Sequence, residues 1–436
     1  MILLLASTIT DYFCGLKMEN TTVKFKKLYL LLSLTINLGM LFVFKYLTFF
    51  TSSVNDLFTF FGLEISDQET AGSYNFNKIL LPIGISFYTF QTLSYTIDIY
   101  RGKIKPEKHF GIFALYVAFF PQLVAGPIER ASRLIPQLKQ KLQTNIINIK
   151  KGLILVAWGY FLKVVVADRL GVYVDMAFSD PDSPHGLSLI LGAFFFCFQI
   201  YFDFSAYTSI AIGIAKIIGI ELMQNFDRPF FAVTVRDFWQ RWHISFMTWL
   251  KDYLYTSIGG SKGSRLKTLR NIFILFFIVG LWHGANWTFV LWGILNAILL
   301  ILEIGTSSFR SKLFKKMGLK KRVIELIGWA FGVSYMVTTL VFFRSPSIEH
   351  AMIYLKNMFQ FKSLHVNILG NYFELFLCLA LIIAVQTVHY FKGNDKIYEL
   401  VINQAKYKRW SLYLGYVFII VLFAINRQNT FIYFQF

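Results

Sequence analysis

The feature that most constrains the fold of this chain is a series of nine long apolar segments separated by polar loops. Most of them approach the roughly 20 residues that an α-helix needs to cross the hydrocarbon core of a bilayer. The segments lie at about 28–50, 78–100, 110–125, 152–167, 187–220, 271–303, 323–343, 371–391 and 410–425. Charged residues make up only 15% of the 436 positions, against about 25% in soluble domains. We therefore expect an all-α polytopic membrane protein rather than a soluble enzyme.

The distribution of Lys and Arg predicts the orientation of the segments. The loops fall into two groups: 14–27, 101–108, 126–151, 221–270, 306–322 and 392–409 contain 34 basic residues together, and 51–77, 169–186 and 345–369 contain 3. The positive-inside rule assigns the first group to the cytoplasm and the second to the extracytoplasmic side. The net charge of +19 is therefore mainly an orientation signal. It does not require nucleic-acid binding, although the basic loops would also attract a phosphorylated cosubstrate.

Two apolar segments join basic loop to basic loop and cannot be simple single crossings. Segment 110–125 ends in a stretch with two prolines and a glycine, so we expect a re-entrant or interfacial segment. Segment 271–303 should contain two short spans or half-helices that meet near Leu281–Trp287, which places His283 deep in the membrane beside Gly284. Loop 221–270 is rich in Trp and Phe, which predicts folded interfacial structure rather than a linker.

Two of the seven histidines are candidates for chemistry, because His283 lies within an apolar run and His243 lies among interleaved aromatic and charged residues. A neutral imidazole at low dielectric suits a general base that activates a hydroxyl. The alternative for each is a core or interfacial histidine satisfied by a hydrogen bond. The other five lie in or beside loops or near a helix end: His109, His185, His350, His365 and His389.

Other residue types give weaker signals. Asp203 lies in the middle of a 34-residue apolar stretch and needs a partner. It would orient a histidine, pair with Arg228 or Arg241, or cap a half-helix, and a structural role is favoured. The three cysteines are too few and too scattered for a metal cluster or a disulfide framework, so we expect small buried hydrophobic residues. Neither candidate histidine belongs to a serine-hydrolase elbow, a zinc-protease pair or a phosphate-binding loop. The glycine-rich stretch GGSKG at 259–263 is a weak signal, which we interpret as a flexible turn rather than a phosphate cradle.

Several ordered motifs together resemble the membrane-bound O-acyltransferase family, in the bacterial branch typified by alginate O-acetyltransferase. The matching elements are LPIGISFYTFQ at 81–91, FPQLVAGPIER at 120–130, DFSAY at 203–207, NFDRPF at 225–230, FWQRWHIS at 238–245, YLY at 253–255, LWHGANW at 281–287 and the tail FIYFQF at 431–436. The resemblance implies about 9–11 transmembrane or re-entrant helices around a central tunnel, in a single domain over 1–436. That branch usually carries a further pair of apolar segments before the stretch that begins near Leu3.

The resemblance also implies a function and a site. The expected enzyme transfers an acyl group from a cytoplasmic thioester, such as acetyl-CoA, to a hydroxyl of an extracytoplasmic glycan or partner protein, in exopolysaccharide or cell-wall modification at the inner membrane. His283 matches the catalytic histidine and would deprotonate the acceptor, and His243 matches the second histidine. The donor or tunnel side would be lined by Arg241, Trp242, Asp237 and Asp203. The thioester carbonyl or the imidazole would be contacted by Tyr253, Tyr255 and Asn286. The CoA nucleotide would be bound by Arg228, Arg236, Arg241 and Lys251. No tightly bound cofactor and no metal are expected, and the partners would include membrane lipid and an extracytoplasmic acetyltransferase protein.

Several alternatives remain open at this point. D-alanyl transfer toward teichoic acid from a carrier protein, or peptidoglycan O-acetylation, would use the same fold. A transporter or flippase would use the intramembrane His and Asp as a proton relay. A catalytically inactive acyl channel would leave the final transfer to its partner.

Overall fold

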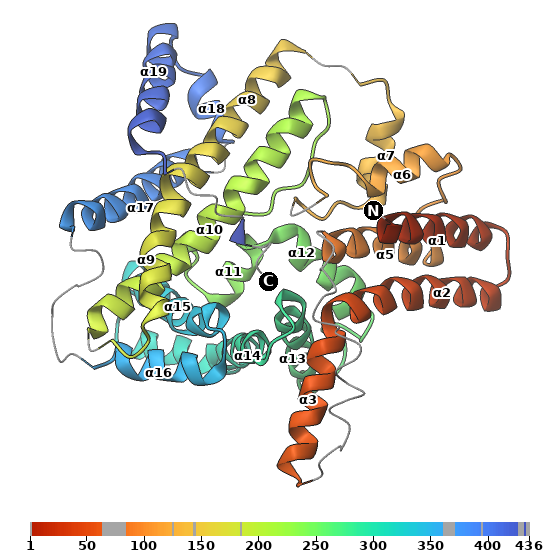
Figure 1. Cartoon of the computed structure of the whole chain (residues 1–436), viewed down its shortest axis with the longest axis horizontal. Helices are drawn as coiled ribbons and strands as arrows, with labels where there is room; N and C mark the ends of the chain where they lie inside the picture. The colour runs from red at the N-terminus through yellow and green to blue at the C-terminus, as the bar shows by residue number, and fades with distance from the viewer. Residues whose placement is uncertain are drawn as a thin grey trace, which may run out of the picture. The chain divides into compact units, whose positions relative to one another are not determined.

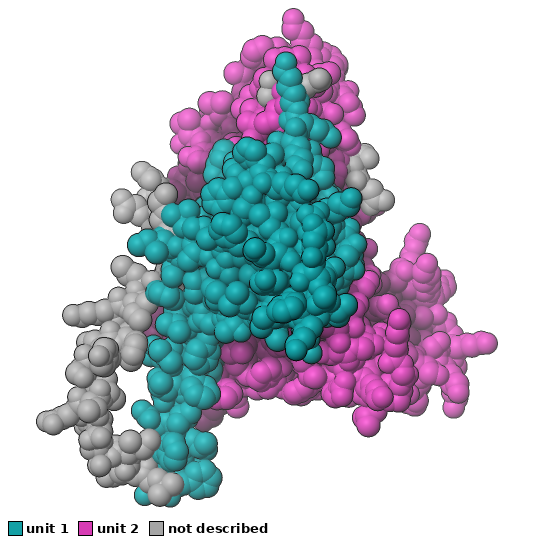
Figure 2. All heavy atoms as spheres, turned by 90° about the vertical axis from the view of Figure 1, so that its right-hand side faces the viewer, with its two compact units in different colours: residues 1–124, 128–141, 282–286 teal, residues 125–127, 142–281, 287–436 magenta. Residues whose placement is uncertain are grey.

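The computed structural model describes residues 2–62, 84–123, 126–142, 145–183, 185–360, 371–393, 396–425 and 431–432. The chain divides into two compact units, shown in two colours in Figure 2. The first unit comprises residues 1–124, 128–141 and 282–286, and the second comprises 125–127, 142–281 and 287–436. The start of the predicted segment 78–100, most of the loop 51–77 and the end of the tail motif lie outside the described residues, as does His365.

The all-helical class is confirmed, since the described residues form helices and contain no strand. Among the described residues, six helical stretches are long and apolar enough to cross a membrane: Val23–Phe60, Gly186–Ile217, Arg265–His283, Trp287–Lys316, Lys321–Arg344 and Tyr372–Lys392. Lipid cannot satisfy backbone N–H and C=O groups, so long apolar segments close their hydrogen bonds within a helix. The chain is therefore a multi-pass membrane protein, and the central tunnel stays a prediction.

The first unit is built on three helices that pack against one another, α1, α2 and α5 (Figure 1). Its elements are α1 (Ile2–Glu19), α2 (Val23–Leu41), the π-helix η1 (Phe42–Tyr46), α3 (Leu47–Phe60), α5 (Ile85–Tyr100), α6 (Phe110–Val117) and α7 (Ala131–Lys139). Helix α6 has only eight residues and is followed by turns. This confirms that segment 110–125 is not a simple crossing.

A fully buried polar cluster joins α1, α2 and α5. The Asp11 carboxylate accepts hydrogen bonds from the Ser33 hydroxyl at 2.5 Å and from the Asn37 amide at 2.9 and 3.1 Å. Ser7 donates to the Asn37 carbonyl oxygen at 2.6 Å, and Ser33 donates to Thr96 at 3.1 Å. Buried polar groups are costly unless they are hydrogen-bonded, so this network fixes how the three helices face one another.

The second unit surrounds the long helix α10 (Gly186–Ile217), which packs against α8, α9, α15 and α16. Its other elements are α8 (Ile146–Phe161), the π-helix η3 (Leu162–Ala167), α9 (Asp168–Ser179), η4 (Pro229–Phe231), α11 (Val235–Arg241), α12 (Ile244–Trp249), the π-helix η5 (Leu250–Tyr255), α13 (Arg265–His283), α14 (Trp287–Lys316), α15 (Lys321–Arg344), α16 (Ile348–Met358), α17 (Tyr372–Lys392), α18 (Ile397–Ile402) and α19 (Lys406–Phe423). The short helices between α10 and α13 confirm that loop 221–270 is folded.

Small residues let the backbones of α8 and α10 touch. A Cβ atom on Gly152 would lie 2.5 Å from the Gly213 carbonyl oxygen, and one on Gly159 would lie 2.5 Å from the Ala206 carbonyl oxygen. Such close approach is typical of helix packing in membranes, where contact between backbones replaces much of the hydrophobic driving force. The two helices run side by side in Figure 1.

The segment 271–303 contains two helices with a break near its middle, as predicted, but they are longer than the half-helices expected. Helix α13 has 19 residues and α14 has 30, so each is long enough to cross a membrane. Helix α13 ends at His283, and α14 begins at Trp287 after a break of residues 284–286. The two helices cross at Gly280 and Gly293, where a Cβ atom on either glycine would lie 2.4 Å from a carbonyl oxygen of the other helix. The candidate catalytic histidine is therefore the last residue of a membrane-spanning helix.

Candidate functional site

His283 lies in the first unit, at the carboxyl end of α13. Its side chain is buried, with 6% of the residue exposed. The neighbouring Trp282 ring lies 5.8 Å from the Phe87 ring and 5.9 Å from the Phe90 ring, both on α5, and 4.8 Å from the His283 ring. The Trp282 ring thus contacts two aromatic rings of α5 as well as the imidazole of His283.

Lys45 fixes the backbone at this helix end. It comes from η1, and its ammonium donates to the Trp282 carbonyl oxygen at 2.5 Å and to the His283 carbonyl oxygen at 3.4 Å. The last carbonyl groups of a helix lack intrahelical donors and carry partial negative charge, so a cation stabilises them. Lys45 is not among the predicted site residues, although an ionisable residue inside an apolar segment is itself a functional signal.

His243 lies in the second unit and occupies the turn between α11 and α12. Its backbone is left-handed, with φ of 44°, and only 1% of the residue is exposed. The ring packs edge-on against Phe204 at 4.8 Å and in a tilted arrangement against Phe246 at 5.0 Å. A left-handed conformation is uncommon outside glycine, although histidine adopts it more readily than most residues. It turns the chain sharply between the two short helices.

Two stretches of the chain pair around this turn. The Ile244 amide donates to the Asn225 carbonyl at 2.9 Å, and the Asp227 amide donates to the Arg241 carbonyl at 3.0 Å. Arg228, which follows, is also left-handed, with φ of 48°. Residues 225–228 and 241–244 are thereby held side by side, which brings together five predicted site residues of the second unit: Arg228, Asp237, Arg241, Trp242 and His243.

Within this group the side chains make local contacts. Asp237 and Arg241 form an ion pair at 2.7 Å within α11, and Trp242 stacks on Phe238 with ring centroids 5.4 Å apart. Arg228 pairs with the adjacent Asp227 at 3.1 Å.

The other predicted residues are more dispersed. Arg236 and Lys251 are exposed, and Asn286 is half-buried in the break before α14. Tyr253 is buried against Trp249, with ring centroids 4.9 Å apart. The Tyr255 hydroxyl lies 2.9 Å from the Ser261 hydroxyl, so it is held by the loop that precedes α13.

Asp203 has a different partner from the one expected. Its carboxylate accepts from the Lys163 ammonium at 2.7 Å and from the backbone amide of Ile432 at 2.6 Å. The prediction of Arg228 or Arg241 as the partner is wrong, because η3 packs along α10 and brings Lys163 to this carboxylate. The buried carboxylate therefore ties the C-terminal segment to α10, which supports the structural role.

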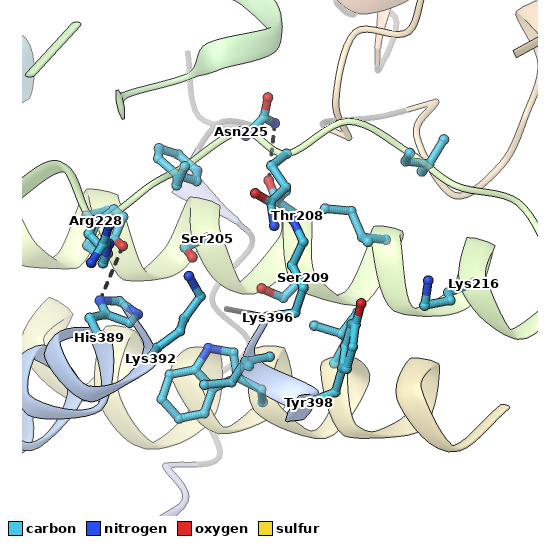
Figure 3. Close-up of a pocket in the computed structure, with 18 of the residues that line it drawn as sticks. Ser205, Thr208, Ser209, Lys216, Asn225, Arg228, His389, Lys392, Lys396 and Tyr398 are labelled. Atoms are coloured by element: carbon cyan, nitrogen blue, oxygen red, sulfur yellow. Dashed lines mark hydrogen bonds between the residues drawn. The ribbon is translucent and has the colours of Figure 1, made fainter. Parts of the chain in front are cut away.

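The second unit contains a pocket with a cavity volume of about 120 Å³ (Figure 3). It is lined by residues of α8, α10, the loop 221–228, α17 and the start of α18. Of the four predicted donor-binding cations, Arg228 is among the described residues that line it, whereas Arg236, Arg241 and Lys251 are not. The sequence analysis discounted His389 because it lies near a helix end, yet this side chain is buried and lines the pocket, 3.5 Å from the Tyr201 hydroxyl.

The three cysteines are free and buried, as predicted. Cys14, Cys197 and Cys378 lie in α1, α10 and α17, where they pack as small apolar side chains.

Comparison with known proteins gives a consistent result. The family model described as MBOAT, membrane-bound O-acyltransferase family, matches residues 107–344. A protein described as a probable alginate O-acetylase of Azotobacter vinelandii is 36% identical over 82% of this chain and 68% of its own length. A peptidoglycan O-acetyltransferase of Helicobacter pylori is 34% identical over 82% of this chain and 69% of its own length. A teichoic acid D-alanyltransferase of Bacillus subtilis is 27% identical over 50% of this chain and 58% of its own length.

The family match covers α6 to α15 and includes both candidate histidines, and the similarity to the first two relatives extends over most of the chain. The resemblance stated from the motifs is thereby confirmed: the chain belongs to the membrane-bound O-acyltransferase family.

Proposed function

We propose that this protein transfers an acetyl group from cytoplasmic acetyl-CoA to a hydroxyl group of an extracytoplasmic polysaccharide, from the inner membrane. The observation that carries the proposal is the buried His283 at the end of a membrane-spanning helix, inside the part of the chain that matches an acyltransferase family. An imidazole at such a place is costly to maintain unless it has a function.

The chemistry follows from the properties of a neutral imidazole. His283 accepts the proton of the acceptor hydroxyl as its oxygen attacks the carbonyl carbon of the thioester. The tetrahedral intermediate then collapses, the C–S bond breaks, and the imidazolium returns the proton to the CoA thiolate. The products are the acetyl ester and free CoA, and the histidine is regenerated.

The relatives favour acetyl over D-alanyl as the acyl group. The two acetyl-transferring relatives are 36% and 34% identical over 82% of the chain, whereas the D-alanyltransferase is 27% identical over 50%. Peptidoglycan is the second candidate acceptor, because the Helicobacter pylori relative is nearly as similar as the alginate O-acetylase. Both acceptors are glycans, so the proposal commits to a glycan hydroxyl.

Donor and acceptor on opposite sides of the membrane require a passage through the protein, since the charged CoA moiety does not cross the bilayer. We place His243, Trp242, Arg241 and Asp237 on the donor side of that passage, because the pairing of residues 225–228 with 241–244 gathers them beside Arg228. An extracytoplasmic acetyltransferase protein completes the delivery in this scheme. Tyr253, Tyr255 and Asn286 remain proposed contacts to the carbonyl or the imidazole.

The test is thiol release from acetyl-CoA by the purified, detergent-solubilised protein, with a candidate polysaccharide and its partner protein present. We expect wild-type protein to release CoA and His283→Ala to reduce the rate to background. His109→Asn is the matched control, because His109 is exposed and an asparagine preserves its cap on α6. Release that is unaffected by His283→Ala would refute the assignment of the base, and no release by folded wild-type protein would refute CoA as the donor.

A further inference from the structure

The pocket of the second unit is unusual for a membrane protein interior because polar and charged side chains from four parts of the chain converge on it. One wall is a strip of hydroxyl groups on α10: Ser205, Thr208 and Ser209 occupy positions i, i+3 and i+4, which lie on one helix face. The opposite side is formed by α17 and the start of α18, from which Lys392 and Lys396 extend toward this strip (Figure 3).

Cations outnumber carboxylates in the lining. Lys216, Arg228, Lys392 and Lys396 line the pocket, against the single carboxylate of Glu221. Lys216 pairs with Glu221, but the Lys216 side chain is 8% exposed and the Glu221 side chain is 62% exposed, so the carboxylate lies at the rim. Arg228 is offset by Asp227, with which it pairs, so the excess positive charge of the lining comes from Lys392 and Lys396.

Burial of the Lys396 ammonium among other cations is unfavourable. Burial lowers the pKa of the Lys396 ammonium, and the charge of Lys216 adds to this effect, whereas Glu221, Glu399 and Asp227 oppose it. A depressed lysine pKa means that the charged form is disfavoured where it stands. An anion between the lysines would remove that penalty, and the α10 hydroxyls would supply further donors to its oxygens.

The pocket is also joined to the segment that carries His243. The Asn225 amide donates to the Thr208 hydroxyl at 3.3 Å and its carbonyl oxygen accepts from the Ser245 hydroxyl at 2.5 Å, while the Asn225 backbone carbonyl accepts from the Ile244 amide. An occupant that contacts Thr208 is thus two hydrogen bonds away from the turn at His243.

We propose that this pocket binds a phosphate group, held by Lys392 and Lys396 on one side and by the Ser205, Thr208 and Ser209 hydroxyls on the other. Its volume of about 120 Å³ far exceeds the roughly 10–15 Å³ that one water needs. Two sources present this chemistry at a basic cytoplasmic end of the protein: the phosphates of a nucleotide-bearing thioester and the headgroup of an anionic phospholipid. The phosphate site does not depend on the proposed reaction, and only its CoA source rests on the proposed donor.

The experiment measures binding rather than turnover, so its outcome is separate from that of the thiol-release assay. The full chain is purified into phosphatidylcholine nanodiscs, and calorimetry measures binding of unacylated CoA in one arm. In the other arm, native mass spectrometry measures retention of phosphatidylglycerol. The variants are Lys392→Gln, Lys396→Gln and Ser209→Asp, the last of which places a carboxylate where the anion would lie. Lys408→Gln is the matched control, since Lys408 is exposed on the same basic segment.

We expect each pocket variant to weaken binding of one of the two probes by roughly 10- to 100-fold, the usual cost of one charge-assisted hydrogen bond. Lys408→Gln should bind like wild type, and higher salt should weaken binding. Dependence in the CoA arm identifies the donor as the source, and dependence in the lipid arm identifies the phospholipid. Binding of neither probe, or binding that the three variants leave unchanged, overturns the proposal. In Ser209→Asp the new carboxylate would pair with the pocket lysines. This variant should therefore fold normally, and its loss of binding would not be due to misfolding.

Discussion

Replacement of Lys45 by methionine tests whether the end of α13 needs its cation. The substitution removes two hydrogen bonds to the carbonyl groups of Trp282 and His283. The bond at 2.5 Å comes from a charged donor and contributes roughly 1.5–3 kcal/mol, whereas the bond at 3.4 Å is too long to add much. A cation at a helix end adds about 0.3–1 kcal/mol, so the local loss is about 2–4 kcal/mol. An ammonium in a membrane span costs roughly 2.5–3.5 kcal/mol, and the substitution removes that cost. The loss and the gain in the overall unfolding free energy therefore nearly cancel.

The effect should therefore be local. We expect the amides of residues 276–290 to exchange hydrogen at least tenfold faster in Lys45→Met, and kcat/KM for thiol release to fall by about 10- to 100-fold, with little change in Tm. Lys45→Arg should retain most of both properties because it keeps the cation. Lys24→Met is the control, since Lys24 is exposed at the start of α2. Wild-type exchange and wild-type kcat/KM in Lys45→Met would show that the cation does not position the histidine.

Three further substitutions test the packing. Gly152→Ala should lower Tm strongly, because its Cβ would meet a backbone oxygen at 2.5 Å, whereas Gly332→Ala, with no atom within 4 Å, should be neutral or stabilise by about 0.5–1 kcal/mol; equal shifts in Tm would contradict the close helix contact. Asp203→Asn should increase protease cleavage near the C-terminus, because it removes the charge that pairs with Lys163 on a side chain that also binds the Ile432 amide. Resistance to protease equal to that of the wild type would argue against this anchoring role of Asp203. Asn37→Ala should cost about 1–3 kcal/mol in detergent unfolding by removing donors from a buried carboxylate, and an unchanged unfolding curve would refute that estimate.

Much of the helical framework could be predicted from the sequence, because the bilayer imposes one solution on long apolar segments. A break near residues 281–287 followed from charge and length, since both ends of segment 271–303 face basic loops, and the structure has it at residues 284–286. The same reasoning anticipated that 110–125 does not cross. These predictions depend on the hydropathy of each segment and on the charge of its flanking loops, and both can be evaluated for one segment at a time.

The contacts between segments could not be predicted in this way. Asp203 and Lys163 are 40 positions apart, and Lys45 and Trp282 are 237 positions apart, so their pairing depends on which helices pack together. His389 was discounted for its position near a helix end, but the packing of α17 against α8 and α10 buries it, with its ring 6.2 Å from that of Trp158. Hydropathy carries no information about such partners.

The glycine crossing of α13 and α14 limits how the molecule can move. With Gly280 and Gly293 in backbone contact, sliding one helix past the other by a single residue would drive a side chain into a carbonyl group. We therefore expect the two helices to move together as a rigid pair. In the proposed reaction, we expect any gating motion to involve other helices. Spin labels on α13 and α14 should report one narrow distance throughout turnover.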